Sequence, residues 1–385
     1  MYVQQKAYSA AIPYLQKAIR KNSKDDSVIV QLARCYYFTR QLPKAQKAFQ
    51  YLLQKNVFPD SLIGTYFQCL KQQGKYKEAK NSIAKYPKKE YAQWTAFCDS
   101  ALLWQKKTKP LKVVNLKKIN SDYSEKSPSF HPKGIFFLSN RESTIIKPKT
   151  GYDGLPYLSL YHAKYDSDSL PSFPKPSNFC SESEFHCGEV FFADTALAYF
   201  SDIRKDRDNV LRSKLYETKL VRGKPTRIKS FIFNDSLCSF YHPCIDRSQQ
   251  LFFFASDMKG GFGGMDLYVS INIDSVWQDP VNLGPSINSV HDELYPFYDS
   301  NGKLFFSSDR PEGMGGFDLF VAVEKKGKWG KVQNLKAPLN SPQDDLGFIV
   351  NKTYTLGLFF SNRNGGMGRE DIYSVRGNLF LLFDK

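Results

Sequence analysis

The chain has 385 residues, 15% of them aromatic, and a formal net charge of +16. Its length predicts two or more domains, and its aromatic content favours β-strands over much of the chain. No stretch approaches the roughly 18 consecutive apolar residues of a transmembrane helix, and residues 1–21 lack the unbroken apolar core of a signal peptide. We therefore expect a mature form or a fragment that has neither an export signal nor a membrane-spanning helix.

The positive charge is concentrated at the N-terminal end. Residues 1–109 hold 20 Lys+Arg and 6 Asp+Glu, whereas the rest of the chain holds 34 and 32, so a domain boundary is predicted near Lys109. A basic domain favours an acidic protein surface, an anionic lipid surface or nucleic acid as its partner. The other interpretation is a solvated lysine face that serves solubility. No recognisable RNA-binding module occurs, so we expect no nucleic-acid partner.

Residues 1–109 repeat with a period of 34 residues. The recurring positions are Tyr8, Leu42 and Tyr76, then Ala11, Ala45 and Ala79, then Cys35 and Cys69. This period is typical of the helix–turn–helix unit of tetratricopeptide (TPR) repeats. The alanines are predicted to lie where the two helices of a unit touch, and the residue three positions earlier is predicted to pack across the same joint.

The two ends of this solenoid differ from its middle. The first repeat is incomplete, because only its second helix, about residues 9–21, has the full pattern. Residues 88–107 are predicted to form a closing helix that covers the apolar face of the last repeat. We interpret its aromatic residues, Trp94 and Trp104 among them, as a joint to the next domain rather than a ligand site.

Three later segments share one pattern, in which a strand ends at Asp or Asn, a glycine-rich loop follows, and the next strand starts at Asp. They are LFFFASDMKGGFGGMDLY at 251–268, LFFSSDRPEGMGGFDLF at 304–320 and LFFSNRNGGMGREDIY at 358–373. The flanking residues are always nine positions apart: Asp257 and Asp266, Asp309 and Asp318, and Asn362 and Asp371. The loops lie 52 and 53 residues apart, a spacing that fits the four short strands of a propeller blade. Weaker copies occur at 136–141 and 198–202.

The glycine-rich loops have two interpretations, a calcium turn and a β-hairpin turn. In the tandem calcium turn the aspartate follows the first glycine by one position fewer than in these loops, and the turn repeats at a far shorter interval than the 52 or 53 residues found here. A phosphate-binding loop fails because no G-x-x-x-x-G-K-[ST] occurs. We favour a structural turn, in which glycine supplies positive φ and the flanking carboxylates accept backbone hydrogen bonds. No cofactor or metal is expected at the six flanking residues.

The units also predict how the propeller closes. Each complete unit ends with a Trp and an Asn-Leu pair, as in Trp277 with Asn282 and Trp329 with Asn334. The last unit lacks this strand, and a matching Asn-Leu occurs at residues 113–116 instead. The N-terminal segment is therefore predicted to complete the last blade and leave no free edge. We count five blades, with a sixth only if residues 142–180 contain more than an insertion.

Cysteines and histidines give weaker signals. The chain has seven cysteines and no C-x-x-C. If the protein is exported, Cys180 with Cys187 or Cys238 with Cys244 would form a disulfide, although buried free thiols are the favoured interpretation. His186 and His242 are assigned to one position in adjacent blades, with Tyr295 in the next blade, and hydrogen-bonded structural histidines are favoured there over a metal site. Neither G-x-S-x-G nor H-E-x-x-H occurs, so we expect no enzyme.

The elements S-S-D-R, G-G-x-D-L-[YF] and W-x-x-x-x-N-L resemble the repeats of TolB-like (WD40-like) β-propellers. A TPR array followed directly by such a propeller resembles the PorE-like proteins of gliding and type IX secretion in Bacteroidota. The resemblance implies a periplasmic protein that is associated with the outer membrane. In that family an OmpA-like domain usually follows and binds peptidoglycan. This sequence does not include that domain, so peptidoglycan binding is not carried over to this chain.

The sequence thus predicts a multidomain α + β fold: a TPR solenoid with its closing helix at 1–109, an all-β propeller of five blades at 110–376, and a tail or the first strand of a further domain at 377–385. The expected function is a non-catalytic protein–protein interaction scaffold of the cell envelope, whose TPR groove holds an acidic segment of a partner. The alternative is a propeller that binds a ligand or carbohydrate, or acts as an enzyme, through its central channel. A cluster of carboxylates converging on that channel would favour the alternative.

Overall fold

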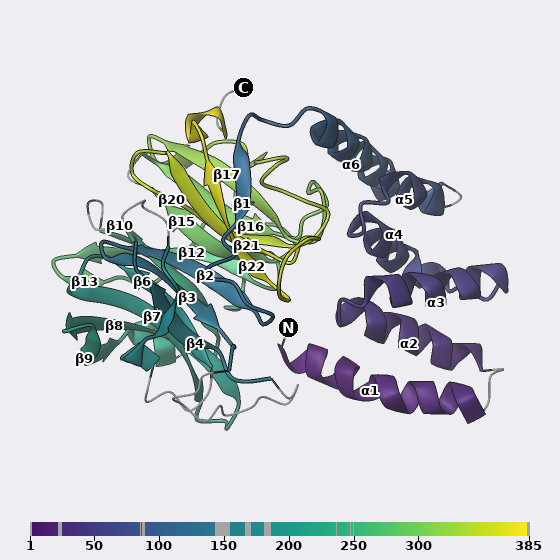
Figure 1. The fold of residues 1–385 in the computed structure, drawn as a ribbon, viewed down its shortest axis with the longest axis horizontal. Coiled ribbons are helices and arrows are strands. Elements are labelled where there is room, and N and C mark those ends of the chain that lie inside the picture. Colours follow the sequence, from purple (N-terminus) through teal and green to yellow (C-terminus); the bar gives the residue numbers. More distant parts are fainter. Residues whose placement is uncertain are drawn as a thin grey trace.

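The computed structural model describes residues 2–382, apart from 22–24, 85, 87–88, 143–154, 166–170, 181–185, 236, 247, 249 and 300. In this part of the chain six α-helices precede five β-sheets. The predicted fold class is confirmed: an N-terminal TPR region is followed by a five-bladed β-propeller. Figure 1 shows the helices stacked in a column beside the propeller.

The helices alternate in direction as TPR units do. They are α1 (Tyr2–Lys21), α2 (Asp26–Phe38), α3 (Leu42–Gln54), α4 (Ile63–Lys71), α5 (Tyr76–Ile83) and α6 (Lys89–Lys106), with a 3-10 turn at Asp60–Leu62 before α4. The carboxylate of Asp25 caps α2 by accepting a hydrogen bond from the backbone N–H of Ser27 at 3.0 Å. The buried residues of these helices form one apolar cluster, which stabilises helices that are short by themselves.

The six residues expected at the TPR joints take different positions. Ala45 and Ala79 are fully buried, and Tyr8 stacks on Phe38 of α2 with ring centroids 4.6 Å apart. Ala11 and Leu42 are half-buried. The sixth residue, Tyr76, is buried and also contacts the propeller, as described below.

Of the two tryptophans of α6, which were both expected at the joint with the next domain, only Trp104 lies there. Trp94 stacks on Phe67 of α4 with ring centroids 5.0 Å apart, and it lies against Gly64 of the same helix. It therefore packs inside the solenoid, and the expectation that it joins the next domain is wrong. Trp104 does face the propeller, since the ammonium of Lys336 lies 5.8 Å from the centre of its ring.

Each sheet is one blade of antiparallel strands, which follow one another in sequence except that β1 joins the last blade. Blade 1 contains β2 (Glu125–His131), β3 (Gly134–Ser139), β4 (Ser159–Ala163) and β5 (Lys175–Pro176), and blade 2 contains β6 (Cys187–Phe192), β7 (Leu197–Lys205), β8 (Leu211–Val221) and β9 (Lys224–Ser230). Blade 3 contains β10 (Phe240–Asp246), β11 (Leu251–Ser256), β12 (Asp266–Ile273), β13 (Val276–Trp277) and β14 (Val281–Asn282), and blade 4 contains β15 (Glu293–Tyr298), β16 (Lys303–Ser308), β17 (Asp318–Lys325), β18 (Lys328–Trp329) and β19 (Gln333–Asn334). Blade 5 contains β20 (Asp345–Val350), β21 (Leu356–Ser361), β22 (Asp371–Arg376) and β1 (Lys112–Asn115).

The ring closes as predicted. Strand β1 pairs antiparallel with β22, with Lys112 opposite Arg376 and Asn115 opposite Tyr373. The N–H of Leu116 extends the pairing to the carbonyl of Ile372 at 3.0 Å. The first and last parts of the propeller sequence therefore share one sheet, and neither leaves an unpaired edge at the junction.

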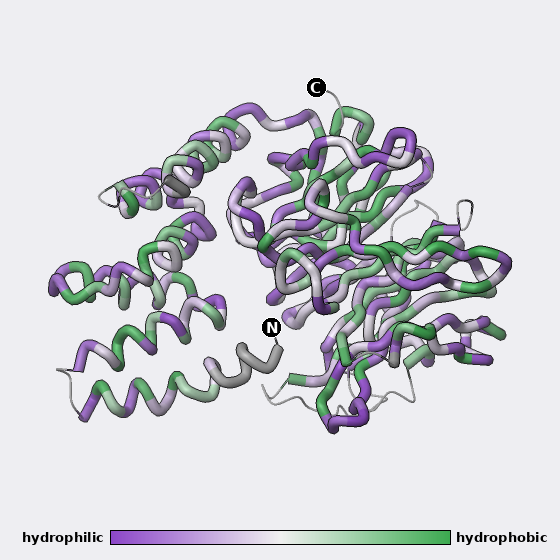
Figure 2. The backbone as a smooth tube through the Cα atoms, turned by 180° about the vertical axis from the view of Figure 1, so that it is seen from behind, coloured by the Kyte–Doolittle hydropathy of each residue, from purple (hydrophilic) through white to green (hydrophobic). Residues whose placement is uncertain are grey.

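The propeller core lies between the blades. Apolar residues of neighbouring sheets form shared clusters, and Figure 2 shows hydrophobic residues along the strands and hydrophilic residues along the outer turns. Residues Leu379–Leu382 form a 3-10 helix, and whether 377–385 is a tail or the start of a further domain stays a prediction. Leu379 is fully buried in the cluster of blade 5, and its N–H bonds to the carbonyl of Tyr354 at 3.1 Å.

One disulfide joins Cys180 to Cys187, so the favoured interpretation of free thiols is wrong for this pair. Both residues border blade 2, where the 3-10 turn Asn178–Cys180 leads toward β6. Cys238 and Cys244 stay unbonded to each other, and Cys244 is buried.

Candidate interaction site

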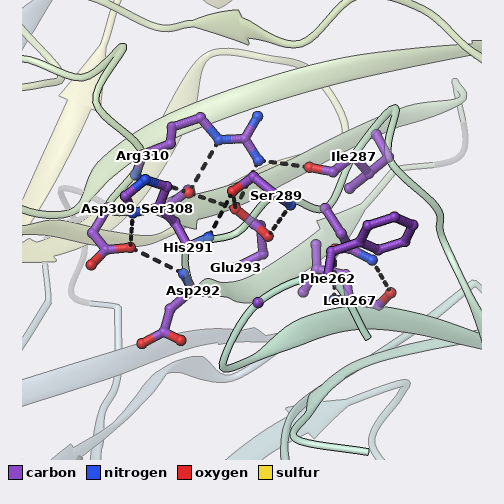
Figure 3. A network of polar contacts seen from close by, with 12 residues as sticks. Phe262, Leu267, Ile287, Ser289, His291, Asp292, Glu293, Ser308, Asp309 and Arg310 are labelled. Carbon is purple, nitrogen blue, oxygen red and sulfur yellow. Dashed lines mark hydrogen bonds and ion pairs between the residues drawn. The ribbon is translucent and has the colours of Figure 1, made fainter. Parts of the chain in front are cut away.

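A buried carboxylate pins each of three blades to the turn before it. In blade 4 the Glu293 side chain is fully buried and accepts hydrogen bonds from the N–H of Ser289 at 2.8 Å and the hydroxyl of Ser308 at 2.7 Å. The carboxylate of Glu293 also forms an ion pair with the guanidinium of Arg310 at 2.8 Å, and this guanidinium donates to the carbonyl of Ile287 at 2.6 Å. Figure 3 shows this network between two neighbouring blades.

The same arrangement occurs twice more. Glu125 pairs with Arg141 at 2.9 Å in blade 1, and Asp345 pairs with Arg363 at 2.5 Å in blade 5. Each arginine lies over two aromatic rings. For Arg310 these are the rings of Phe306 and Phe320, whose centres lie 5.3 and 5.2 Å from the guanidinium carbon. Such stacking adds to the charge pair. These three carboxylates are therefore committed to the fold. A Ser-x-Arg tripeptide after an upstream acid was the available signal for them.

The second flanking residue of each glycine loop folds the loop over itself. In blade 3, Asp266 accepts from the N–H groups of Phe262 at 2.6 Å and Gly263 at 3.1 Å, and from the amide of Asn282 at 2.8 Å. Asp371 repeats this in blade 5. Its donors are Met367 N at 2.5 Å, Gly368 N at 3.0 Å and Asn115 Nδ2 at 2.6 Å. In blades 3 and 5 the Asn-Leu motif thus supplies an amide for the loop aspartate.

The first flanking residue of each loop bonds to the segment that enters its own blade. Asp257 accepts from the N–H of Ser239 at 2.7 Å and Asp309 from that of Asp292 at 3.0 Å. The side-chain oxygen of Asn362 accepts from the N–H of Asp344 at 2.8 Å. A carboxylate and a neutral amide therefore serve the same position. Across the described ranges, no group of three or more His, Cys, Asp and Glu residues is placed to hold a metal ion.

Blade 4 departs from this scheme at Asp318. Its carboxylate accepts from the N–H of Gly315 at 3.0 Å, but its Oδ1 is buried with no partner among the described residues, and so is the Nδ2 of Asn334. Burial raises the pKa of Asp318 to about 7, and the charge of Lys71 acts in the opposite direction. Lys71 itself is only 1% exposed, and burial lowers its pKa.

Lys71 is part of a joint that the sequence did not reveal, between the TPR domain and the loop of blade 4. Its ammonium donates to the carbonyl of Pro311 at 3.2 Å, and the hydroxyl of Tyr76 donates to the carbonyl of Met314 at 2.7 Å. Met314 is 1% exposed and belongs to the apolar cluster of the helices. The helix end at Lys71 and the helix start at Tyr76 therefore clamp one loop.

Two further contacts extend this joint toward blade 5. The guanidinium of Arg40 pairs with Asp344 at 3.0 Å and donates to the side chain of Gln72 at 2.6 Å. At the α4–α5 turn, Gly74 has a φ of +71°, and a Cβ there would lie 3.1 Å from the ring of Pro342. Glycine thus suits both the left-handed conformation and the close approach of this turn. Part of the positive charge of the TPR domain is directed at the acidic residues of its own propeller.

A cleft of about 310 Å³ opens beside the joint. Both domains line it, through Arg40, Leu42, Pro43, Gln72, Gln73, Lys75, Gln343, Asp344, Asn362 and Asn364. Most of its lining residues have polar side chains, with side-chain amides on both sides. The cleft is therefore a place where one ligand segment would touch the solenoid and the propeller together.

The first strands of the blades lie against one another around the axis, and each contains a β-bulge. In blade 3 the bulge holds His242, with a φ of +58°, and in blade 4 it holds Tyr295, with a φ of +54°. The two rings stack with centroids 3.6 Å apart. His242 also lies 3.6 Å from the carboxylate of Glu189, and burial lowers its pKa to about 4.

The strand register corrects two assignments in blade 2. Its bulge follows Cys187, so Gly188 occupies the position of His242, and His186 does not. The ring nitrogen of His186 accepts from the N–H of Leu158 at 3.0 Å instead. By the same register Phe200 matches Phe253, so the weak copy at 198–202 is offset by two residues. Blade 2 has a tight β7–β8 hairpin in place of a glycine loop.

The comparisons with known proteins support the TPR region and show nothing about function. A tetratricopeptide repeat model matches residues 2–60, which are a small part of the chain. The search of curated proteins found no match to this chain. A gluconolactonase from Xanthomonas campestris is 11% identical over 69% of this chain and 89% of its own, with a TM-score of 0.38. A thermostable family-43 glycoside hydrolase is 11% identical over 67% and 90%, with a TM-score of 0.42. A protein of unknown function from Dyadobacter fermentans is 11% identical over 66% and 76%, with a TM-score of 0.41.

Similarities at this level support no argument about activity or substrate. Among the helices of the described part of the chain, none is long and apolar enough to cross a membrane. What the structure and the repeat model establish is an N-terminal TPR region, of a kind that suggests protein–protein interaction, joined to a five-bladed propeller.

Proposed function

We propose that the chain is a non-catalytic protein–protein interaction scaffold of the bacterial cell envelope. By its resemblance to PorE-like proteins, it acts in the periplasm at the outer membrane, within a secretion or gliding assembly. The observation that carries the scaffold proposal is the buried joint of Lys71, Tyr76 and Met314. Two domains of a binding type are held together there by specific contacts, so that they present one composite surface.

The joint supports a scaffold more than a flexible pair of modules. Interfaces between domains of one chain are usually polar and allow relative motion unless they are large and apolar. Here Met314 enters the apolar cluster of the helices, and Lys71 loses nearly all of its exposure. Moving the domains apart would expose both groups and break two hydrogen bonds to loop carbonyls.

The alternative of a channel-based ligand site receives less support. Such a site would need carboxylates that converge on the axis and stay open to a ligand. Among the bulge residues of the five first strands, Glu189 is the one carboxylate. It faces His242, whose ring is covered by Tyr295. The acidic residues nearby, such as Glu293, already bind an arginine.

The partner is expected to be acidic where it meets the TPR domain. Lys47 and Lys77 are exposed on α3 and α5, apart from the two cations that the joint uses. The cleft beside the joint would take part of an extended segment, because its amides on both walls suit a polypeptide backbone. The sequence-level alternative, a lysine face that serves solubility alone, predicts no such partner.

The test uses the purified full chain, immobilised and exposed to the native cell-envelope fraction. A protein partner should be retained at ~50 mM salt and largely released at ~500 mM, because added salt shortens the Debye length. The double variant Lys47→Glu/Lys77→Glu should lose the partner at low salt. Its matched control is Lys326→Glu/Lys328→Glu on the exposed β17–β18 turn, which should retain it. Retention that ignores salt and the TPR variant would overturn the acidic partner, and no retained protein would overturn the scaffold.

A further inference from the structure

Blade 3 exposes two apolar side chains at positions that are covered in blade 4. Phe262, at the tip of the glycine loop, is 45% exposed, and Val290, in the neighbouring turn, is 80% exposed. By sequence spacing their equivalents in blade 4 are Met314 and Pro342. Met314 is 1% exposed, and Pro342 lies against Gly74 of the TPR domain. The same pair of positions is thus open in one blade and occupied in the next.

The equivalence rests on contacts as well as on spacing. The carboxylate of Asp292 accepts from the N–H of Met265 at 2.9 Å, and that of Asp344 accepts from the N–H of Phe317 at 3.0 Å. Both contacts join a glycine loop to the turn that carries Val290 or Pro342. The loop and the turn therefore form one surface in each blade, with the same backbone frame.

Blade 4 shows what kind of element fits this surface. The turn between α4 and α5 covers it, with Lys71 and Tyr76 donating to the loop carbonyls at 3.2 and 2.7 Å. Gly74 at the apex of the turn lets the backbone approach Pro342. The ends of two helices bring a cation, a hydroxyl donor and a small residue to the loop at once.

The charge around the open surface suits the same kind of element. Asp257 is exposed beside the loop of blade 3. Asp292 and Asp309 lie beside His291, as Figure 3 shows, and Asp292 also accepts from the N–H of Met265 in that loop. Lys259 is the basic residue on the loop itself. Asp309 is already influenced by the charge of Arg40. Asp257 and Asp292 against Lys259 leave a local negative charge, which attracts a cation.

The other glycine loop is a poorer match. In blade 5 the tip residue Met367 is also exposed, at 43%, but Asp122 stands where blade 3 has Val290 and blade 4 has Pro342. An aspartate there places a charge in the centre of the surface. Blade 3 alone of these three loops combines both apolar positions with an uncovered face in the described chain.

We infer that the surface formed by Phe262 and Val290 docks the turn between two helices of a helical-repeat partner protein. The turn would offer a lysine or tyrosine donor to the loop carbonyls and a small residue above Val290, as α4 and α5 do in blade 4. A second copy of this chain is not the expected partner, because its own Lys71 and Tyr76 are buried in its own joint. This inference rests on the proposed scaffold function and names a partner for the propeller.

The experiment places the photo-crosslinker p-benzoylphenylalanine at Phe262 of the full chain. The protein is irradiated with the native cell-envelope fraction, and crosslinked peptides are mapped by mass spectrometry. Val276, an apolar residue of the same blade that is 61% exposed on its outer edge, carries the crosslinker in the control. We expect a crosslink from Phe262 to a turn between two helices of another protein, and none from Val276.

A variant sharpens the result. Val290→Asp gives blade 3 the residue of blade 5 and should reduce the crosslink from Phe262 by at least about tenfold, the effect of losing one central apolar anchor. Equal yields at Phe262 and Val276, a crosslink to a second copy of the chain, or one to an extended segment would each overturn the inference.

A third crosslinker position separates this inference from the proposed function. Tyr14 of α1 is 76% exposed and reports on partners of the TPR domain. A crosslink from Tyr14 to an envelope protein, with none from Phe262, leaves the scaffold in place and overturns the docking surface. No envelope protein at either position overturns both.

Discussion

The glycine loops of blades 3 and 4 are built from the same frame and meet different surroundings. In both, an aspartate at the end of the loop accepts backbone N–H bonds from the loop tip, through Asp266 in one and Asp318 in the other. The tip residue is half-exposed in blade 3, as Phe262, and buried beneath two helices in blade 4, as Met314. The flanking acids therefore make the turn, and the tip decides what the turn contacts.

The loop of blade 4, which the helices cover, also contains buried polar atoms that lack hydrogen bonds. In blade 3 the amide of Asn282 reaches the carboxylate of Asp266 at 2.8 Å. In blade 4 the corresponding amide nitrogen of Asn334 and one oxygen of Asp318 are buried without partners among the described residues. A buried polar atom without a hydrogen bond is destabilising. The covered loop thus depends on Lys71 in a way that the open loop does not.

The largest expected effect comes from removing that cation. Lys71→Met keeps the length of the side chain and leaves Asp318 facing no positive charge, so at pH 8 it should lower the free energy of unfolding by about 3–5 kcal/mol. The double variant Lys71→Met/Asp318→Asn should recover most of the loss. Urea unfolding followed by tryptophan fluorescence measures both. A double variant as unstable as the single one would show that the two groups do not interact.

The loop tips should differ almost as much. Met314→Ala removes a buried side chain from the cluster of the helices and should cost about 2–5 kcal/mol. Phe262→Ala removes a larger side chain from the same position of blade 3, and because that position is exposed the change should stay within about 0.5 kcal/mol. Thermal melting of the two variants side by side tests this. Comparable losses would mean that blade 3 is also covered.

The sequence predicted what repeats and missed what occurs once. The 34-residue period and the nine-residue interval recur, so the solenoid, the blades and the closure by β1 followed from them. The joint forms between Lys71 and Pro311, which are 240 positions apart. Neither residue departs from its local pattern, since a lysine at a helix end and a proline in a loop are both ordinary. No local signal could therefore predict the contact.

Register was the second limit of the sequence. A β-bulge inserts one residue in the first strand of each blade, and in blade 2 it falls after Cys187. Motif spacing alone aligned His186 with His242 and missed this offset. The buried pair of Glu293 and Arg310 was visible only as two separate recurrent residues, because their distance of 2.8 Å depends on the pairing of β15 with β16 inside blade 4.

Stability should depend on pH through the covered loop. In the unfolded chain the carboxyl of Asp318 has its ordinary pKa of 3.8, and in the folded protein burial raises this pKa to about 7. Between the two values the folded state holds a proton that the unfolded state has released. The free energy of unfolding therefore falls as pH rises from about 4 to about 7, by at most about 1.4 kcal/mol per pH unit.

A single variant isolates this slope. Asp318→Asn cannot take up the proton and should flatten the pH dependence relative to the wild type. Urea midpoints measured at half-unit steps of pH for the two proteins give the difference. Parallel curves for the wild type and Asp318→Asn would contradict the assignment.

The smallest expected effect concerns the first residue of the interval, where the blades use different side chains for one contact. Asp309 accepts from the N–H of Asp292 at 3.0 Å, and Asn362 accepts from that of Asp344 at 2.8 Å. Asp309→Ala should cost about 1 kcal/mol, the typical worth of one hydrogen bond, because the side chain is 39% exposed. Asp309→Asn should be nearly neutral, since blade 5 already makes the contact with a neutral amide. Melting curves with calcium and with chelator complete the test. A structural carboxylate predicts that the two curves of the wild type coincide, and a calcium-dependent rise of several degrees that both variants lose would make the loop a metal site.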